Sequence, residues 1–258
     1  MRTPLLLVVS MAVACGASPA TAPKTAPPVS GVVSTAIADA VDATDREEAD
    51  RILDGGRDPK DTLAFFGIAP GMKVADLGAG RGYTSELLAR VVGPDGKVWA
   101  ENPAKLLGFV GNDWAVRLGK PVMKNVIRVD RELDDPLPPE AKDLDAVLMV
   151  LVYHDSVWMG VDRDKMNRAV FAALKSGGVF GVVDHSAKKG DGTTVAQTFH
   201  RIEESVVIDE VKRAGFTLDG EGTFLKNETD TRDWNDSPSA AGNKRGTSDR
   251  FVLRFKKP

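Results

Sequence analysis

The chain has 258 residues, 42% of them hydrophobic and 28% charged, which suits one globular α/β domain with a small appendage. Its formal net charge of −3 excludes the basic surface typical of nucleic-acid-binding proteins, so we expect no nucleic-acid partner. The one cysteine, Cys15, lies near the N-terminus, so the rest of the chain has no disulfide, thiolate zinc site or cysteine nucleophile.

The first fifteen residues predict a signal peptide. Arg2 is followed by an apolar run of ten residues, Leu5 to Ala14, which is too short to span a bilayer as a helix. Residues 11–16 resemble a bacterial lipoprotein cleavage box with Cys15 as the lipidated residue, although Ala12 stands where that box usually has Leu or Val. The alternative is a plain signal peptide. We expect an exported protein, periplasmic or anchored to the outer membrane only through Cys15.

Residues 16–36 are rich in Ala, Pro, Thr and Ser and predict a flexible linker. The folded domain is expected over 37–258. It begins with a predicted helix over 37–53, broken or bent near Asp45, and a second helix over 60–66 that packs on the domain.

The rest of the chain alternates between predicted strands and helices. Helices are expected from Glu86 onward and over 103–118, 162–175 and 202–214, and a polar, mobile loop over 226–249. Apolar runs predict strands over 73–76, 97–101, 126–130, 144–152, 179–183, 216–224 and 250–256. This alternation predicts a Rossmann-like, doubly wound, mostly parallel sheet with helices on both faces.

A glycine-rich turn follows the first strand, which ends in Asp76. A dinucleotide-binding fingerprint has glycines at positions one, three and six, but counting from Gly78 the sixth position is Tyr83. The Asp76 carboxylate would repel a pyrophosphate and suit a cationic ligand. Glu101 ends the second strand, where an acid can accept both hydroxyls of a ribose. A ribose with a positive charge and no phosphate describes S-adenosylmethionine better than NAD.

These residues resemble the first motif of class I S-adenosylmethionine-dependent methyltransferases, strand-Asp-x-Gly-x-Gly-x-Gly, over residues 74–83. Residues 174–178, Leu-Lys-Ser-Gly-Gly, resemble that family's Leu-Lys-Pro-Gly-Gly element, with Ser176 in place of Pro. The chain also resembles a group of exported bacterial methyltransferase-like proteins with Tyr-His-Asp after the fourth strand and Asp-His after the fifth. The resemblance covers about residues 65–257.

The resemblance implies a seven-stranded sheet whose last strand is antiparallel, and S-adenosylmethionine as cofactor. By position in the motif, the glycine turn would face the methionine moiety, Glu101 would hold the ribose, Asp130 would stand near the adenine, and residues 151–153 would line the floor. The implied cofactor-binding residues are Asp76, Gly78, Ala79, Gly80, Gly82, Tyr83, Glu101, Asp130 and Tyr153.

The three histidines are expected at one rim of the sheet. His154 and His185 follow neighbouring parallel strands and His200 begins the next helix, with Asp155 and Asp184 beside them. Such a cluster can supply a general base, and we take His154, Asp155 and His185 as candidate catalytic residues. It can also bind a divalent metal, but no compact motif such as His-x-x-x-His is present, so no metal ligand is assigned.

The leading hypothesis is methyl transfer from S-adenosylmethionine to a small-molecule acceptor, with catalysis mainly by proximity and orientation. Trp158 and Met159 beside the rim suggest either an apolar acceptor pocket or a hydrophobic patch covered by the N-terminal helices. One feature opposes this hypothesis, because the cofactor is made in the cytosol whereas the leader predicts export. The alternatives are an exported methyltransferase-like binding protein and a metal-dependent enzyme using the rim formed by His154, His185 and His200. No sequence feature specifies an oligomeric state.

Overall fold

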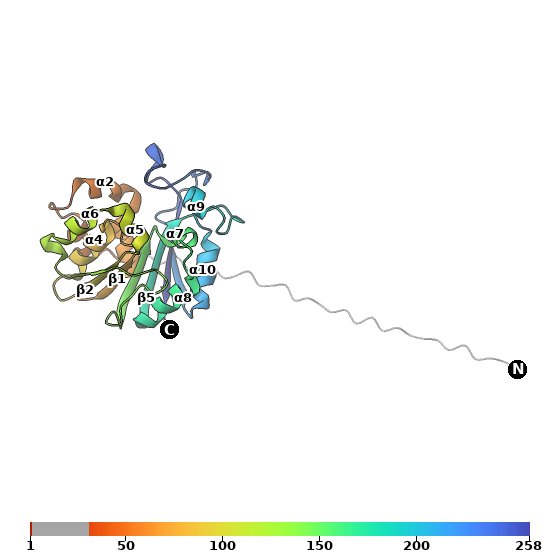
Figure 1. Ribbon diagram of the computed structural model, residues 1–258, viewed down its shortest axis with the longest axis horizontal. Coiled ribbons are helices and arrows are strands. Elements are labelled where there is room, and N and C mark those ends of the chain that lie inside the picture. Colours follow the sequence, from red (N-terminus) through yellow and green to blue (C-terminus); the bar gives the residue numbers. More distant parts are fainter. Residues whose placement is uncertain (2–30) are drawn as a thin grey trace.

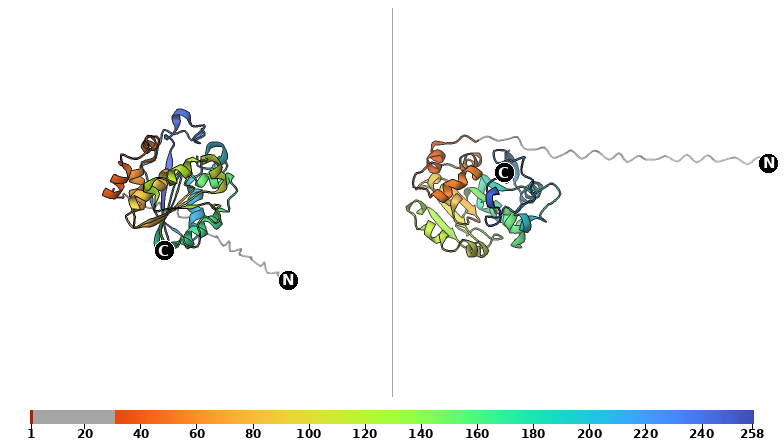
Figure 2. Two further views of the ribbon diagram at one scale, coloured as in Figure 1. Left: turned by 60° about the vertical axis from the view of Figure 1, so that its left-hand side comes forward. Right: turned by 90° about the horizontal axis from the view of Figure 1, so that it is seen from above.

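The computed structural model describes residue 1 and residues 31–258. Residues 31–258 form a central sheet with helices on both faces (Figures 1 and 2). The expected signal peptide, Met1 apart, and the linker up to residue 30 lie outside the described residues. The first helix begins at Thr35, so the last two residues of the expected linker, 35 and 36, belong to the fold.

The sheet has seven strands in the order β3-β2-β1-β4-β5-β7-β6. β7 alone runs antiparallel, inserted between β5 and β6, while the other strands run parallel to one another. This confirms the predicted doubly wound sheet with an antiparallel last strand. The strands are β1 (Lys73–Leu77), β2 (Lys97–Glu101), β3 (Val126–Val129), β4 (Leu144–Val150), β5 (Leu174–His185), β6 (Thr217–Gly222) and β7 (Arg250–Lys256).

Helices cover both faces of the sheet, and each face has its own hydrophobic core. On one face the core includes Phe65, Leu87 and Leu88, which two of the helices direct toward the sheet. On the other face it includes Met166 and Val211. The helices are α1 (Thr35–Val41), α2 (Glu48–Arg57), α3 (Pro59–Phe66), α4 (Tyr83–Val92), α5 (Ala104–Val110), α6 (Asp113–Leu118), α7 (Tyr153–Trp158), α8 (Arg163–Ala173), α9 (Ala196–Phe199) and α10 (Glu204–Arg213). None of the described helices is long and apolar enough to cross a membrane.

Two of the predicted helices are each divided into two. The predicted helix over 37–53 is α1 and α2, which confirms the expected break near Asp45, and the Arg46 guanidinium between them donates to the Val41 carbonyl oxygen at 2.6 Å. The predicted helix over 103–118 is α5 and α6, because Gly111 between them has φ +56° and cannot continue a helix.

Two further boundaries differ from the sequence expectation. The helix expected over 162–175 ends at Ala173 because Leu174 already pairs with Leu144 of β4, so β5 begins five residues earlier than predicted. The helix expected from residue 202 begins at Glu204, because Ile202 forms a β-bridge with Ser186.

The segment 226–249 is tethered to the domain and is not the mobile loop that its polar sequence suggests. The Asp230 carboxylate accepts from the Arg201 guanidinium at 2.8 Å, from Trp234 Nε1 at 2.7 Å and from the Asp249 N–H at 2.7 Å. Arg201 is fully buried. This segment and α2 both rise at the end of the sheet where β4 leads into α7 (Figure 1).

Position 78, in the turn after β1, needs a glycine for two reasons. Its φ is +65°, which is accessible to glycine at little cost, and a Cβ at this position would lie 2.6 Å from Val152 Cγ2. Val152 follows β4, so the absence of a side chain at Gly78 lets the β1 and β4 loops meet directly.

We expect Gly78→Ala to destabilise the fold by roughly 2–4 kcal/mol, because strain at positive φ adds to a clash with Val152. Gly67→Ala is the matched control, since Gly67 has φ +72° but no atom within 4 Å of an added Cβ, and should cost only about 1 kcal/mol. Urea denaturation of both variants measures the difference. Equal losses would contradict a steric role for Val152.

Candidate functional site

The candidate site lies at the carboxyl ends of β1, β2 and β4. β1 pairs with β2 on one side and with β4 on the other, so the loops that leave these strands diverge above β1. In doubly wound sheets ligands bind in the crevice at such a switch point. The fold therefore places the glycine turn, Glu101 and the β4 loop around one crevice, as the sequence predicted.

The backbone N–H groups of the glycine turn are already bound within the protein. The Gly78 N–H donates to Glu101 Oε2 at 2.9 Å and the Ala79 N–H to the Glu101 carbonyl oxygen at 2.8 Å. The Gly80 N–H donates to Asn102 Oδ1 at 2.8 Å, and the Gly82 N–H to the Ala79 carbonyl oxygen at 2.9 Å. A phosphate-binding loop needs such groups free, so this turn is not built to cradle a pyrophosphate.

Glu101 presents an unused acceptor beside this turn. Its side chain is fully buried, Oε2 is bound to Gly78, and Oε1 has no hydrogen-bond partner within the described structure. Burial raises the pKa of Glu101 well above its usual value. A buried polar atom without a partner is costly, so Oε1 is suited to bind a ligand hydroxyl.

Asp76 is a buried carboxyl group at the end of β1. It is 2% exposed, and its Oδ2 accepts from Ser85 Oγ at 2.5 Å. Burial raises the pKa of Asp76 to about 7, against the opposing effects of the Ser85 hydroxyl and of the positive charge of Arg57. A cationic ligand placed here would stabilise the ionised carboxylate.

The helix α2 covers this crevice. The Arg57 guanidinium lies 4.4 Å from the centroid of the Tyr83 ring, and the Tyr83 hydroxyl donates to Asp54 Oδ1 at 2.5 Å. Tyr83 therefore anchors α2 in this structure. Arg57 also lines a cavity with Leu151 and Arg250 that has a volume of only about 10 Å³, which is too small for a nucleoside.

Two residues expected at the cofactor lie apart from this group. The Tyr153 side chain is buried in the core, where its hydroxyl donates to Glu210 Oε2 at 2.9 Å and accepts from Asn167 Nδ2 at 2.9 Å. Asp130 follows β3, with a half-exposed carboxylate that pairs with Arg128 Nε at 2.8 Å. Their assignment to cofactor binding stays a prediction.

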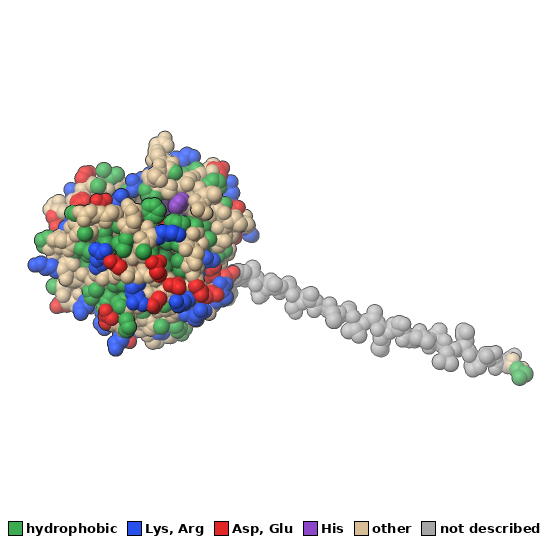
Figure 3. All heavy atoms as spheres, in the orientation of Figure 1, with side chains coloured by type: hydrophobic (Ala, Val, Ile, Leu, Met, Phe, Trp, Pro, Cys, Tyr) green, Lys and Arg blue, Asp and Glu red, His purple; other side chains and the backbone are tan. Residues whose placement is uncertain are grey.

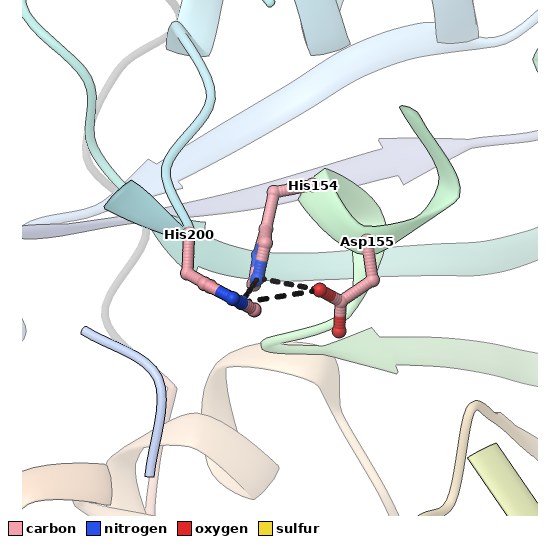
Figure 4. Close-up of side chains that lie close together, drawn as sticks. All are labelled: His154, Asp155 and His200. Atoms are coloured by element: carbon pink, nitrogen blue, oxygen red, sulfur yellow. Dashed lines mark hydrogen bonds and ion pairs between the residues drawn. The ribbon is translucent and has the colours of Figure 1, made fainter. Parts of the chain in front are cut away.

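The three histidines meet at the neighbouring rim, as predicted. His154 is central, since its ring centroid lies 5.6 Å from that of His185 and 5.2 Å from that of His200. His154 Nδ1 lies 2.7 Å from Asp184 Oδ1. On the other side of the ring, His154 Nε2 lies 3.0 Å from Asp155 Oδ1 (Figure 4). Histidine atoms reach the surface beside hydrophobic side chains (Figure 3).

His154 and His185 have opposite electrostatic environments. Burial opposes the charged form of His154, but the Asp184 and Asp155 carboxylates outweigh it and raise the pKa of His154 to about 10. Burial lowers the pKa of His185 to about 4, despite the nearby Asp236 carboxylate. At neutral pH His154 is therefore protonated and His185 neutral, and neither has the pKa near 7 that suits a general base.

His185 is held by the segment that follows β6. Its Nδ1 lies 2.8 Å from Ser248 Oγ and 2.5 Å from Asp236 Oδ2, and the side chain is buried. Through these contacts His185 connects the histidine rim at the end of β5 to the segment over residues 236–248.

Several residues of the site were missed by sequence reasoning. Asn102 binds Gly80 through both atoms of its side-chain amide, accepting from the Gly80 N–H and donating to the Gly80 carbonyl oxygen, and it could have been noticed as the neighbour of Glu101. Arg57 reaches the crevice only because α2 folds over it, which no local sequence pattern shows.

Trp158 was expected to line an acceptor pocket. Its Nε1 donates to Asp155 Oδ1 at 2.8 Å, and Lys105 Nζ lies 5.0 Å from its ring centroid.

We expect the stability of the wild-type protein, relative to Asp76→Asn, to fall as the pH rises from 4 to 7. The unfolded chain loses the Asp76 proton near pH 4, whereas the folded protein keeps it until about pH 7, so ionisation opposes folding across this interval. The slope should reach at most about 1.4 kcal/mol per pH unit and vanish above pH 7.

Urea denaturation of wild type, Asp76→Asn and the exposed-turn control Asp95→Asn, at intervals between pH 4 and 8, measures this dependence. A difference between wild type and Asp76→Asn that is constant with pH would contradict the raised pKa of Asp76.

Comparisons with known proteins agree on the fold. No protein-family model matches the chain. Fibrillarin 3 of Arabidopsis thaliana, a candidate rRNA 2'-O-methyltransferase, is 29% identical over 152 residues, which are 56% of this chain and 47% of the relative. The chain thus spans about half the length of this curated relative.

Two solved structures of methyltransferases have a similar fold. A SAM-dependent methyltransferase from Aquifex aeolicus matches with a TM-score of 0.56 at 18% identity, over 83% of this chain and 95% of that one. The glycopeptide N-methyltransferase MtfA, complexed with sinefungin, matches with a TM-score of 0.53 at 15% identity, over 79% and 87% of the two chains. The chain therefore has the Rossmann-like fold of S-adenosylmethionine-dependent methyltransferases.

Proposed function

We propose that this protein is a methyltransferase that uses S-adenosylmethionine to methylate a small-molecule acceptor. The observation that carries the proposal is the buried, unpartnered Oε1 of Glu101 beside a turn whose N–H groups are already used. This combination favours a ligand that offers a hydroxyl and no phosphate. The buried Asp76 adds a preference for positive charge, and the fold supports the same cofactor.

The bound cofactor would supply a methyl group activated by its sulfonium sulfur. In this proposal Glu101 accepts from the ribose hydroxyls through Oε1 while the Gly78 N–H keeps Oε2 in place. Asp76 faces the positively charged methionine portion, where Arg57 now supplies the nearest positive charge. The protein then acts mainly by holding the acceptor in line with the methyl group.

The rim contributes polar groups at the acceptor side. His154 and His185 are kept as candidate catalytic residues, with Asp155 fixing His154 Nε2 at 3.0 Å. Because protonated His154 already faces Asp184 through Nδ1 and Asp155 through Nε2, its role there would be to hold these two carboxylates in place at the acceptor side.

Binding is the direct test of the cofactor. Isothermal titration calorimetry should show that S-adenosylmethionine and its demethylated product bind and that NAD does not. Glu101→Gln should weaken both interactions by roughly 10- to 100-fold, because it replaces one of the two carboxyl oxygens, which face Gly78 and the ligand, with an amide NH2 group that cannot accept a hydrogen bond. The exposed Glu140→Gln is the matched control and should bind as wild type does. Absence of binding at millimolar concentration would refute the proposal.

The acceptor class needs a separate measurement. The net charge of −3 supports a small molecule, whereas the similarity to fibrillarin 3 favours RNA as the second candidate. Cofactor carrying a tritiated methyl group, incubated with the protein and either total RNA or a small-molecule extract, should label only the small-molecule fraction. Label in RNA would identify the second candidate. Cofactor binding without label in either fraction would favour a methyltransferase-like binding protein.

We also propose that residues 1–15 direct export and that Cys15 anchors the mature protein. The apolar run ahead of Cys15 supports this proposal. Fractionation of bacteria that express the full chain should find the protein in the membrane fraction, and Cys15→Ser should release it into the periplasm. Cytoplasmic recovery of an uncleaved chain would contradict export.

A further inference from the structure

We propose that His154, Asp155 and His200 form a binding site for one divalent transition-metal ion, with Zn²⁺ as the fitting probe. The ligand atoms are His154 Nε2, Asp155 Oδ1 and His200 Nδ1, which all lie within 4.8 Å of one another. Two imidazole nitrogens and one carboxylate oxygen are a common ligand set for such ions. The proposal does not depend on methyl transfer.

The distances between the three ligand atoms fit a single ion. His154 Nε2 lies 3.0 Å from Asp155 Oδ1 and 3.2 Å from His200 Nδ1, and His200 Nδ1 lies 3.3 Å from Asp155 Oδ1. Bonds of 2.0–2.1 Å to a tetrahedral ion place two ligand atoms about 3.3 Å apart. The triangle is thus close to the size that one ion requires, and the three side chains point toward its centre (Figure 4).

The surroundings orient the ligands. Asp184 Oδ1 lies 2.7 Å from His154 Nδ1 and holds the proton on that nitrogen, so a metal ion at Nε2 would displace only the second proton, which protonated His154 carries there. Trp158 Nε1 donates to Asp155 Oδ1 at 2.8 Å and fixes the carboxylate. A carboxylate that binds the far nitrogen of a metal-ligating histidine is the usual outer shell of such sites.

Charge and access also suit a cation. Two carboxylates, Asp155 and Asp184, flank one imidazole in a largely buried position, since their side chains are 13% and 0% exposed. A divalent ion would offset this negative charge. The His200 side chain is 23% exposed, so an ion can enter from solvent, and three protein ligands leave a further position for water or a substrate.

The sequence predicted that these three residues lie at one rim that could bind a divalent metal, but it did not single them out as the ligand set, because the ligands come from two elements. His154 and Asp155 are adjacent in α7, and His200 lies 46 residues from His154, immediately after α9. The expectation that His185 would take part differs from the geometry, in which His185 Nδ1 faces Ser248 and Asp236.

Equilibrium dialysis of the tag-free chain against micromolar Zn²⁺, followed by metal analysis, should find one equivalent bound. Replacement by Co²⁺ should produce visible absorption bands that report nitrogen and oxygen ligation. Neither readout depends on enzyme activity. Binding well below one equivalent, or a Co²⁺ spectrum identical to that of free aqueous ion, would overturn the proposal.

Substitutions of the proposed ligands test whether these residues form the metal site. His200→Asn and Asp155→Asn should each weaken Zn²⁺ binding by at least tenfold and remove the Co²⁺ bands. Asparagine is chosen at position 200 because His200 has φ +53°, which Asn tolerates. Asp233→Asn removes an exposed carboxylate that pairs with Lys188 and should bind as wild type does.

Thermal unfolding in the presence of a chelator shows that each variant is folded. If His200→Asn and Asp155→Asn fold but still bind one Zn²⁺ as tightly as wild type, the ion lies elsewhere and the proposal is wrong. Cys15, the one thiol of the chain, is retained in all variants and therefore does not affect this comparison.

Discussion

The burial of acidic side chains at the carboxyl end of the sheet is the constraint on which the site depends. Asp76, Glu101 and Asp184 end or nearly end β1, β2 and β5, and none is more than 2% exposed. Such groups are retained only where hydrogen-bond donors or cations compensate for lost hydration. Each of the three acids therefore determines the chemistry of the groups placed next to it.

The two halves of the site meet this constraint in different ways. Around Asp76 and Glu101 the compensation is incomplete, since one carboxyl oxygen lacks a partner and the nearest positive charge, Arg57, comes from the covering helix α2. Around Asp184 it is complete, because this carboxylate accepts from the His154 N–H, from His154 Nδ1 and from the His185 N–H. The first half is prepared for a ligand, and the second is a rigid support for His154.

The helix α2, which covers the crevice, is bound to the elements around the glycine turn. Tyr83, the first residue of α4, binds Asp54 of α2, and buried Arg117 of α6 joins Asp50 of α2 to Glu86 of α4 through contacts of 2.6 Å. These contacts connect elements on either side of the glycine turn. A ligand that enters the crevice must work against them, so the affinity of this site and the stability of the N-terminal helices are coupled.

The sequence by itself determined the fold class, the seven strands, the glycine turn with Asp76 and Glu101, and the meeting of three histidines at one rim. These follow from local patterns, because strand ends and tight turns are encoded by neighbouring residues and parallel strands bring their carboxyl ends together. Tertiary structure alone decided which nitrogen faces which oxygen, that Tyr153 turns into the core, and that α2 closes the crevice. Those outcomes depend on packing between distant segments, which no local pattern records.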